Sequence, residues 1–265
     1  MFAHRGGRAL GPENTLAAFD LGVQAGADGL ELDVRLSADG VVVVHHDHTL
    51  DRTTSASGLL AARTAADLAR VDAGCHFASG TVYPFRGQGI GVPTLRDVLR
   101  RYPETRVIIE MKVDSREMGE AVARDVRAAG AVDRVCAAGY GDRSVTAVRA
   151  ALPDMACSAS GAEVRLAVYR GWARWPVRRA RYGGYQVPEH TGVLRIVSPH
   201  FPDETGRLRI VSPRFIRYAH GAGLKVQVWT VDDESDMRRL LEWGVDGLIS
   251  NRPDLAVRVR NSCCP

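Results

Sequence analysis

Residues 29–47 read GLELDVRLSADGVVVVHHD, and two strands can be recognised in this stretch. Residues 29–34 form a short, largely apolar run, and residues 41–46 form a second one. Too few residues separate the two runs for the crossover helix that parallel neighbours need. Because Asp39-Gly40 between them is a strong hairpin signal, we expect residues 41–46 to run antiparallel to the end of the first strand.

Elsewhere, short apolar runs alternate with amphipathic stretches, which is typical of βα units around a parallel sheet. The amphipathic stretches predict helices that begin near Asn14 or Thr15 and helices over residues 94–102, 116–129, 143–152, 214–222 and 234–243. The apolar runs predict parallel strands at residues 2–4, 29–34, 106–111, 134–138, 155–159, 185–187, 224–231 and 247–250. Eight parallel strands in 265 residues favour a closed TIM (β/α)8 barrel over an open sheet.

Residues 47–92 differ in composition from the rest of the chain. They are rich in Gly, Ser, Thr and Ala, and only residues 64–70 have a helical pattern. We interpret this region as an insertion on the rim of the barrel after the second strand. Residues 1–265 are therefore expected to form a single TIM-barrel domain.

Composition and charge exclude several classes of protein. With 45% hydrophobic and 25% charged residues, the chain is typical of globular proteins and not of disordered ones. A net charge of +4 suits a small anionic substrate but is too weak to indicate nucleic-acid binding. No apolar leader or membrane-spanning run is present, and the five cysteines lack metal-type spacing. We therefore expect a cytoplasmic protein without stable membrane insertion.

Three acidic residues occupy matching positions on two predicted strands. Glu31 and Asp33 are two apart, so both side chains point the same way, and Glu110 sits at the same stage of the strand at residues 106–111. Three carboxylates without thiolates or clustered imidazoles indicate a hard cation, Mg²⁺ or Ca²⁺. The alternative is neutralisation by salt bridges with nearby basic residues, namely Arg5, Arg35 and Lys112.

Two histidines stand where they can act with this acidic group. His4 ends the first predicted strand, and His46 ends the hairpin strand. Because histidine titrates near neutrality, such a pair can take a proton from one oxygen and give one to another. Arg5 offers a bidentate fork for a phosphate. His45 should point to the opposite face from His46, and we assign it a structural role.

These residues, with others in the same order, resemble the glycerophosphodiester phosphodiesterase family. The resemblance spans almost the whole chain. The matching motifs are His4-Arg5-Gly6, Pro12-Glu13-Asn14-Thr15, Glu31-Leu32-Asp33-Val34, Asp39-Gly40, His46-Asp47, Leu50, Arg52-Thr53-Thr54, Gly58, Pro93-Thr94-Leu95, Ile109-Glu110, Lys112, Val228-Trp229-Thr230-Val231 and Gly244-Val245-Asp246-Gly247.

The resemblance implies a TIM barrel with an insertion after the second strand. It also implies metal-dependent hydrolysis of glycerophosphodiesters to glycerol 3-phosphate and an alcohol. One divalent cation, Ca²⁺ or Mg²⁺, would be held by Glu31, Asp33 and Glu110. One departure is Asn251, where the family usually has Asp after the last strand. Because Asn caps helices about as well, we expect little consequence.

The resemblance also implies roles for the remaining site residues. His4 would accept a proton, and His46 would donate one. Arg5 and Lys112 would contact the phosphate, and Trp229 would line the glycerol end of a small-molecule substrate.

Other activities of the same barrel are alternatives. Lysophospholipids could be hydrolysed in the manner of a lysophospholipase D. A retaining glycosidase would use Glu31 and Glu110 as its carboxylate pair, without a metal or two histidines. A binding module would hold a phosphorylated ligand without turning it over.

Two further features lie outside the candidate site. Residues 170–182 are basic and aromatic and could rest on an anionic membrane, although a solvated helix and loop is the favoured interpretation. The sequence LRIVSP at residues 194–199 recurs at residues 208–213, and we assign this short repeat no function.

Overall fold

The computed structural model describes residues 1–172, 175, 180–191 and 208–263. Within these residues, eight parallel strands follow one another in the order β6-β5-β4-β2-β1-β11-β10-β7. A parallel bridge between Ser158 and Gly184 joins the two ends of this order, and the amide of Ala159 donates to the Gly184 carbonyl at 2.9 Å. The TIM-barrel prediction is therefore confirmed. The strands are β1 (Phe2–Ala3), β2 (Gly29–Leu36), β4 (Arg106–Met111), β5 (Val135–Gly139), β6 (Ala156–Cys157), β7 (Gly184–Pro188), β10 (Lys225–Trp229) and β11 (Gly247–Ser250).

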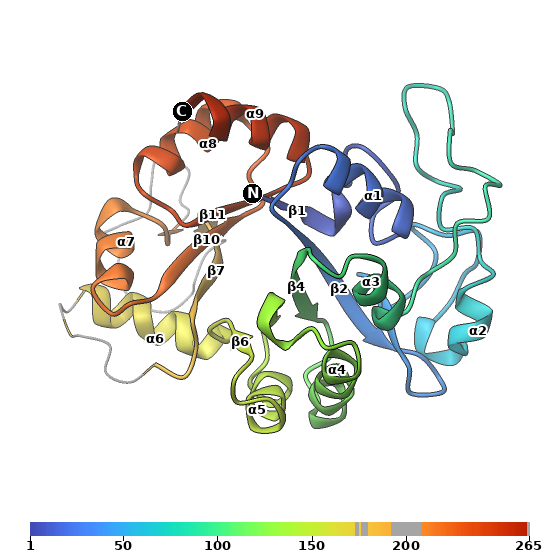
Figure 1. The fold of residues 1–265 in the computed structure, drawn as a ribbon, viewed down its shortest axis with the longest axis horizontal. Coiled ribbons are helices and arrows are strands. Elements are labelled where there is room, and N and C mark those ends of the chain that lie inside the picture. The colour runs from blue at the N-terminus through green and yellow to red at the C-terminus, as the bar shows by residue number, and fades with distance from the viewer. Residues whose placement is uncertain (173–174, 176–179, 192–207, 264–265) are drawn as a thin grey trace.

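Helices surround the strands (Figure 1). Several begin at the hydroxyl caps that the sequence places there. Thr15 accepts from the amide of Ala18, and Thr94 forms a capping box with Asp97. The helices are α1 (Leu16–Gln24), α3 (Leu95–Arg101), α4 (Arg116–Ala128), α5 (Asp142–Ala151), α6 (Gly161–Trp172), α7 (Pro213–His220), α8 (Glu234–Glu242) and α9 (Pro253–Cys263).

The layer between strands and helices forms the core. Leu30, Leu32 and Val34 of β2 are fully buried in the same apolar cluster as Leu95 of α3 and Met118 of α4. The intervening residues of β2 therefore face the barrel interior, because successive side chains of a strand alternate between its two faces. This alternation places the acidic residues of β2 inside the barrel.

The hairpin strand β3 (Val42–Val44) runs antiparallel to β2, as predicted, with Val34 opposite Val44. It is shorter than residues 41–46, so both histidines of the predicted strand lie in the loop that follows. The amide of His45 still donates to the Asp33 carbonyl at 2.9 Å, which keeps this loop beside the end of β2.

Residues 47–92 lie outside the ring of strands, drawn in cyan and teal in Figure 1. They contain the 3-10 turn Leu60–Ala62 and the short helix α2 (Ala65–Leu68). Leu50, Leu60 and Leu68 of this region pack in a small apolar cluster that also contains Val43 of β3. The interpretation of this region as an insertion within a single domain stays a prediction.

Some features of the chain were not predicted or lie outside the described residues. A two-stranded ladder of β8 (His190–Thr191) and β9 (Leu208–Arg209) was missed, because each strand has only two residues. The first copy of the LRIVSP repeat and much of the basic stretch at residues 170–182 lie outside the described residues. In the described part of the chain, no helix combines the length and apolar character that crossing a bilayer requires.

The buried contact between α4 and the strands can be tested by truncation. Met118 is fully buried, so Met118→Ala should lower the free energy of unfolding by about 2–5 kcal/mol. Leu166 of α6 is 48% exposed, and Leu166→Ala should change it by less than about 0.5 kcal/mol. Urea unfolding followed by circular dichroism measures both. Equal losses would contradict this assignment of the core.

Candidate active site

A tight turn brings His4 and Arg5 to one end of the barrel. The 3-10 turn His4–Gly6 follows β1, with φ values of 52° at Arg5 and 87° at Gly6. A β-carbon on Gly6 would lie 2.8 Å from the carbonyl carbon of Ala18, so the turn packs against α1 only with glycine here. His4 and Arg5 are buried in this turn.

Glu31 and Asp33 of β2 meet Glu110 of β4 at the same end of the barrel. Asp33 pairs in register with Glu110, and Glu31 lies two residues earlier on the same face as Asp33. One carboxylate oxygen from each residue lies within 4.8 Å of the other two. Glu31 and Asp33 are buried, and the Glu110 side chain is partly exposed. The structure thus brings together the three carboxylates that the sequence singled out.

This group of carboxylates is only partly neutralised by the protein. Burial, followed by the charges of Asp33 and Glu110, raises the pKa of Glu31 well above its usual range. Burial also opposes ionisation of Asp33, but Lys112 and Arg5 outweigh it and lower the pKa of that carboxyl. Lys112 Nζ lies 3.0 Å from Asp33 Oδ1 and 2.9 Å from Glu110 Oε1. Salt bridges therefore accompany the cluster, but they leave Glu31 poorly compensated.

The oxygens of the cluster lie at distances that one cation can bridge. Asp33 Oδ1 is buried and forms an ion pair with Lys112 Nζ at 3.0 Å. A hard cation with metal–oxygen bonds of about 2.0–2.6 Å can join oxygens up to 4.8 Å apart. Carboxylate oxygens alone also suit Mg²⁺ or Ca²⁺. The residues therefore fit one divalent cation, whose charge would compensate Glu31 without a proton.

Backbone and amide donors orient these carboxylates. The amide of Arg5 donates to Glu31 Oε2 at 3.0 Å. Asn14 Nδ2 donates to Asp33 Oδ2 at 2.8 Å, and the Asp33 amide donates to Asn14 Oδ1 at 3.2 Å. The Arg5 side chain lies between two carboxylates, with Nε 3.2 Å from Asp33 and Nη1 2.8 Å from Glu13. Arg5 is therefore fixed beside the cluster before any phosphate arrives.

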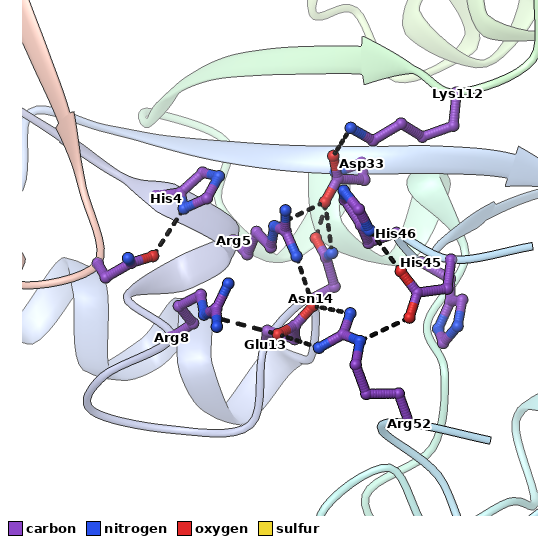
Figure 2. A network of polar contacts seen from close by, with 12 residues as sticks. His4, Arg5, Arg8, Glu13, Asn14, Asp33, His45, His46, Arg52 and Lys112 are labelled. Carbon is purple, nitrogen blue, oxygen red and sulfur yellow. Dashed lines mark hydrogen bonds and ion pairs between the residues drawn. The ribbon is translucent and has the colours of Figure 1, made fainter. Parts of the chain in front are cut away.

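His46 belongs to a chain of charged contacts (Figure 2). His46 Nδ1 lies 2.6 Å from Asp47 Oδ1, and Arg52 Nε donates to Asp47 Oδ2 at 2.6 Å. Arg52 also donates to both oxygens of Glu13, at 2.9 and 2.8 Å. Burial opposes ionisation of Asp47, but the hydrogen bonds from Arg52 and His46 outweigh it and lower the pKa of Asp47. This chain links His46 through Glu13 to Arg5.

The two neighbouring histidines have different surroundings. His45 is buried, and its Nε2 lies 3.0 Å from the Thr49 carbonyl oxygen. The His46 side chain is 30% exposed and lies beside Asp33 and Arg5 in Figure 2. The described residues include no ion pair within 4.0 Å between Arg35 and the acidic cluster, and Arg35 Nε instead donates to the His46 carbonyl at 2.8 Å.

His4 is held by an amide. Its Nδ1 lies 2.6 Å from Asn251 Oδ1, and Asn251 Nδ2 donates to Asp232 Oδ2 at 2.6 Å. Burial lowers the pKa of His4, and the hydrogen bond with Asn251 only partly opposes this effect. The expectation that the Asn251 side chain caps a helix is therefore wrong, because it contacts His4 and Asp232 instead, and the expectation of little consequence stays a prediction. Its side chain contacts a candidate catalytic residue.

A cavity of about 340 Å³ opens beside His4. His4, Glu31, Glu110, Arg165 and Gln186 contribute polar groups to its lining, and Trp229, 41% exposed, also lines it. The rest of the lining is mostly apolar and includes Ile108, Ala138, Ala159, Val164, Val187, Ile210 and Ile249. The cavity thus joins the acidic cluster to an apolar surface.

The structure adds residues to which sequence reasoning gave no role. Glu13 and Asn14 lie in the Pro-Glu-Asn-Thr motif, and Asp47 and Arg52 lie in motifs beyond the second strand. Their place in recognised motifs was the available signal. Asp232 belonged to no quoted motif, and only its contact with Asn251 brings it into the site.

The barrel and its site place the chain among the (β/α)8-barrel enzymes. The family model described as "Glycerophosphoryl diester phosphodiesterase family" matches residues 4–255. A glycerophosphodiester phosphodiesterase of Caldanaerobacter subterraneus is 28% identical over 98% of this chain and 96% of its own length. The crystal structure of a glycerophosphodiester phosphodiesterase from Agrobacterium tumefaciens has a TM-score of 0.75 at 29% identity, covering 97% of this chain and 98% of that one.

A phosphodiesterase of Oleispira antarctica, solved in complex with the product sn-glycerol-3-phosphate, has the same fold. Its TM-score is 0.76 at 24% identity, covering 98% of this chain and 96% of that one. The chain belongs to the glycerophosphoryl diester phosphodiesterase family, and it is an enzyme of that class. This membership excludes the glycosidase and the silent binding module as interpretations of the barrel.

The buried contacts of Glu13 predict a pH-dependent contribution to stability. Burial opposes its ionisation, but Arg52 and Arg5 lower the pKa of Glu13 from 4.5 to about 2. Because the folded-state value is the lower one, this stabilisation is present above about pH 4.5 and is lost as the pH falls toward 2. Glu13→Gln should therefore lower the free energy of unfolding by up to about 3 kcal/mol at pH 7.

Urea unfolding at several pH values measures the difference in the free energy of unfolding between the wild type and Glu13→Gln, which should shrink toward pH 2. Glu234→Gln is the matched control, because Glu234 forms an exposed surface pair with Arg238. It should change the free energy of unfolding by less than about 1 kcal/mol at any pH. A Glu13→Gln difference that stays constant with pH would contradict the assignment.

Proposed function

We propose that the protein hydrolyses glycerophosphodiesters to glycerol 3-phosphate and an alcohol, using one divalent cation and two histidines. The observation that carries this proposal is the gathering of Glu31, Asp33 and Glu110 within 4.8 Å, with His4 Nε2 3.8 Å from Glu31. Figure 2 draws His4 and His46 on either side of Arg5 and Asp33. A phosphate between the two rings would have a proton acceptor on one side and a donor on the other.

The surroundings of the two rings support different roles. His4 is buried beside a neutral amide, which favours the uncharged imidazole that a proton acceptor needs. His46 presents Nδ1 to the Asp47 carboxylate at 2.6 Å, which orients the ring and leaves Nε2 as the nitrogen that can reach the leaving alcohol. We therefore assign His4 to deprotonate the nucleophile, either water or a neighbouring glycerol hydroxyl. His46 then protonates the leaving alcohol as its bond to phosphorus breaks.

The remaining residues bind and orient the substrate. When bound at Glu31, Asp33 and Glu110, a divalent cation supplies positive charge for the phosphate oxygens. Arg5 and Lys112 add cationic groups at the same place and are held there by the carboxylates. Trp229 lines the same cavity as His4, which suits contact with the glycerol end of the substrate. The product complex of the Oleispira antarctica relative supports this choice of product.

A second candidate substrate is a lysophospholipid. The cavity beside His4 has a mostly apolar lining, which a glycerol group alone does not require. An acyl chain on the glycerol could lie against Val164, Val187 and Ile210 while the phosphodiester keeps its place. Assays of glycerophosphocholine and lysophosphatidylcholine side by side would rank the two substrates.

We also propose a cytoplasmic location, which cysteine usage supports. Cys75 and Cys157 are buried free thiols in the structure. Such thiols are typical of reducing compartments.

Substitution of the histidines tests their roles. His4→Gln and His46→Gln should each lower kcat for glycerophosphocholine by about 10² or more, because each removes a proton-transfer group. His45→Gln is the matched control and should retain most of the activity, since His45 contacts the Thr49 backbone. Release of glycerol 3-phosphate measures all three. Loss of activity in His45→Gln with full activity in His46→Gln would reverse the assignment.

Removal of the cation tests the acidic cluster. Chelation should abolish hydrolysis, and adding back Mg²⁺ or Ca²⁺ should restore it and identify the effective ion. The effective ion should also raise the melting temperature of the wild type, because a ligand that binds only the folded state stabilises it. Glu31→Gln should lose this shift, whereas Asp20→Asn, in a surface pair with Arg101, should keep it. A chelator-resistant enzyme would exclude metal dependence.

A further inference from the structure

Three donors converge on the carboxylate of Asp232. The backbone amide of Asn251 and the Ser250 hydroxyl donate to its Oδ1 at 2.8 and 3.0 Å. Asn251 Nδ2 donates to its Oδ2 at 2.6 Å. An ionised carboxylate can only accept, so all three groups must present hydrogens to it. The Asn251 side chain therefore turns its NH₂ group toward Asp232 and its carbonyl oxygen the other way.

That carbonyl oxygen meets His4. The 2.6 Å contact between Asn251 Oδ1 and His4 Nδ1 is a hydrogen bond only if Nδ1 carries the proton. In the neutral ring, Nε2 is then the atom with a free lone pair. Nε2 lies 3.8 Å from Glu31 Oε2, too far for a hydrogen bond, and His4 lines the cavity. The acceptor atom of the ring is thus directed to the place where substrate would bind.

We propose that Asp232, acting through Asn251, is a positioning residue that selects the neutral tautomer of His4. Asp232 does not line the cavity and would touch neither substrate nor cation. Asp232 fixes the orientation of the Asn251 side-chain amide, and that orientation determines which ring nitrogen of His4 can accept a proton. The inference rests on the proposed role of His4 as proton acceptor, but the tautomer itself can be observed without turnover.

The isosteric variant Asp232→Asn separates charge and acceptor capacity from shape. In this variant the side-chain carbonyl oxygen takes the place of Oδ1, where it accepts from two donors, and the new NH₂ group takes the place of Oδ2, which has one donor. That NH₂ group faces the side-chain amide of Asn251. The Asn251 side chain then flips and presents its own NH₂ group to His4. His4 must accept at Nδ1 and carry its proton on Nε2. We expect kcat to fall on the order of 10- to 100-fold, because the proton acceptor is lost, with KM nearly unchanged.

Exchanging the acid and the amide between the two positions should restore the tautomer. In the double variant Asp232→Asn with Asn251→Asp, the carboxylate at 251 accepts from both His4 Nδ1 and the amide at 232. Its kcat should recover to within about fivefold of the wild type, since the proton acceptor is restored. Asn251→Asp alone is the matched control. It places two carboxylates at a 2.6 Å contact and should impair the enzyme.

The experiment uses the full chain with saturating Mg²⁺ or Ca²⁺ for kinetics, and ¹⁵N-histidine NMR to identify the protonated ring nitrogen of His4. Support requires an Nδ1-protonated His4 in the wild type, an Nε2-protonated one in Asp232→Asn, and recovery of kcat in the exchange variant. Thermal unfolding confirms that each variant is folded. If Asn251→Asp fails to fold, the other two variants decide the matter.

Two outcomes would overturn the inference. One is an Asp232→Asn enzyme with an unchanged tautomer and unchanged kcat. The other is a folded exchange variant no more active than Asp232→Asn. Failure of the proposed function looks different. In that case His4→Gln would remain active, while the tautomer of His4 would still change in Asp232→Asn.

Discussion

The constraint on which the site depends is the confinement of three carboxylates to neighbouring positions on two adjacent parallel strands. The pairing of Asp33 with Glu110 fixes the distance between them, and the two-residue period of β2 adds Glu31 to the same face. Burial makes this arrangement unfavourable unless positive charge is present. Lys112 and Arg5 supply part of it, while burial still raises the pKa of Glu31 well above its usual range. The three carboxylates thus have the residue types and spacing that fit one divalent cation.

Around this centre, the two candidate catalytic histidines are held in different ways. His46 contacts a carboxylate directly, and Asp47 is in turn fixed by Arg52. His4 contacts the side-chain amide of Asn251, and Asn251 in turn donates to the carboxylate of Asp232. Burial also lowers the pKa of His4, which favours the neutral ring that a proton acceptor needs. The two imidazoles thus differ in the groups that their Nδ1 atoms contact.

Much of the barrel could be predicted because local patterns determine it. The alternation of short apolar runs with amphipathic stretches gave the eight parallel strands, and Asp39-Gly40 gave the antiparallel direction of β3. The ladder of β8 and β9 could not be predicted, because two-residue strands have no recognisable period. The carboxylates were also predictable, since a shared strand face and matching strand ends follow from spacing alone. Asn251 was misjudged because its position after a strand suggests a cap, while its partner is more than two hundred residues away.

The sequence by itself determined the barrel, the acidic residues that face its interior and the family to which its ordered motifs point. These are encoded by periodicity and by residue type over short distances. Only the tertiary structure decided which groups surround each histidine, because β1 lies between β2 and β11 and thereby sets His4 beside Asn251. Closing a barrel brings together the first strand and the last, and no local pattern specifies which side chains meet there. The hydrogen-bond geometry at that junction, and the proton position that it imposes on His4, belong to the fold.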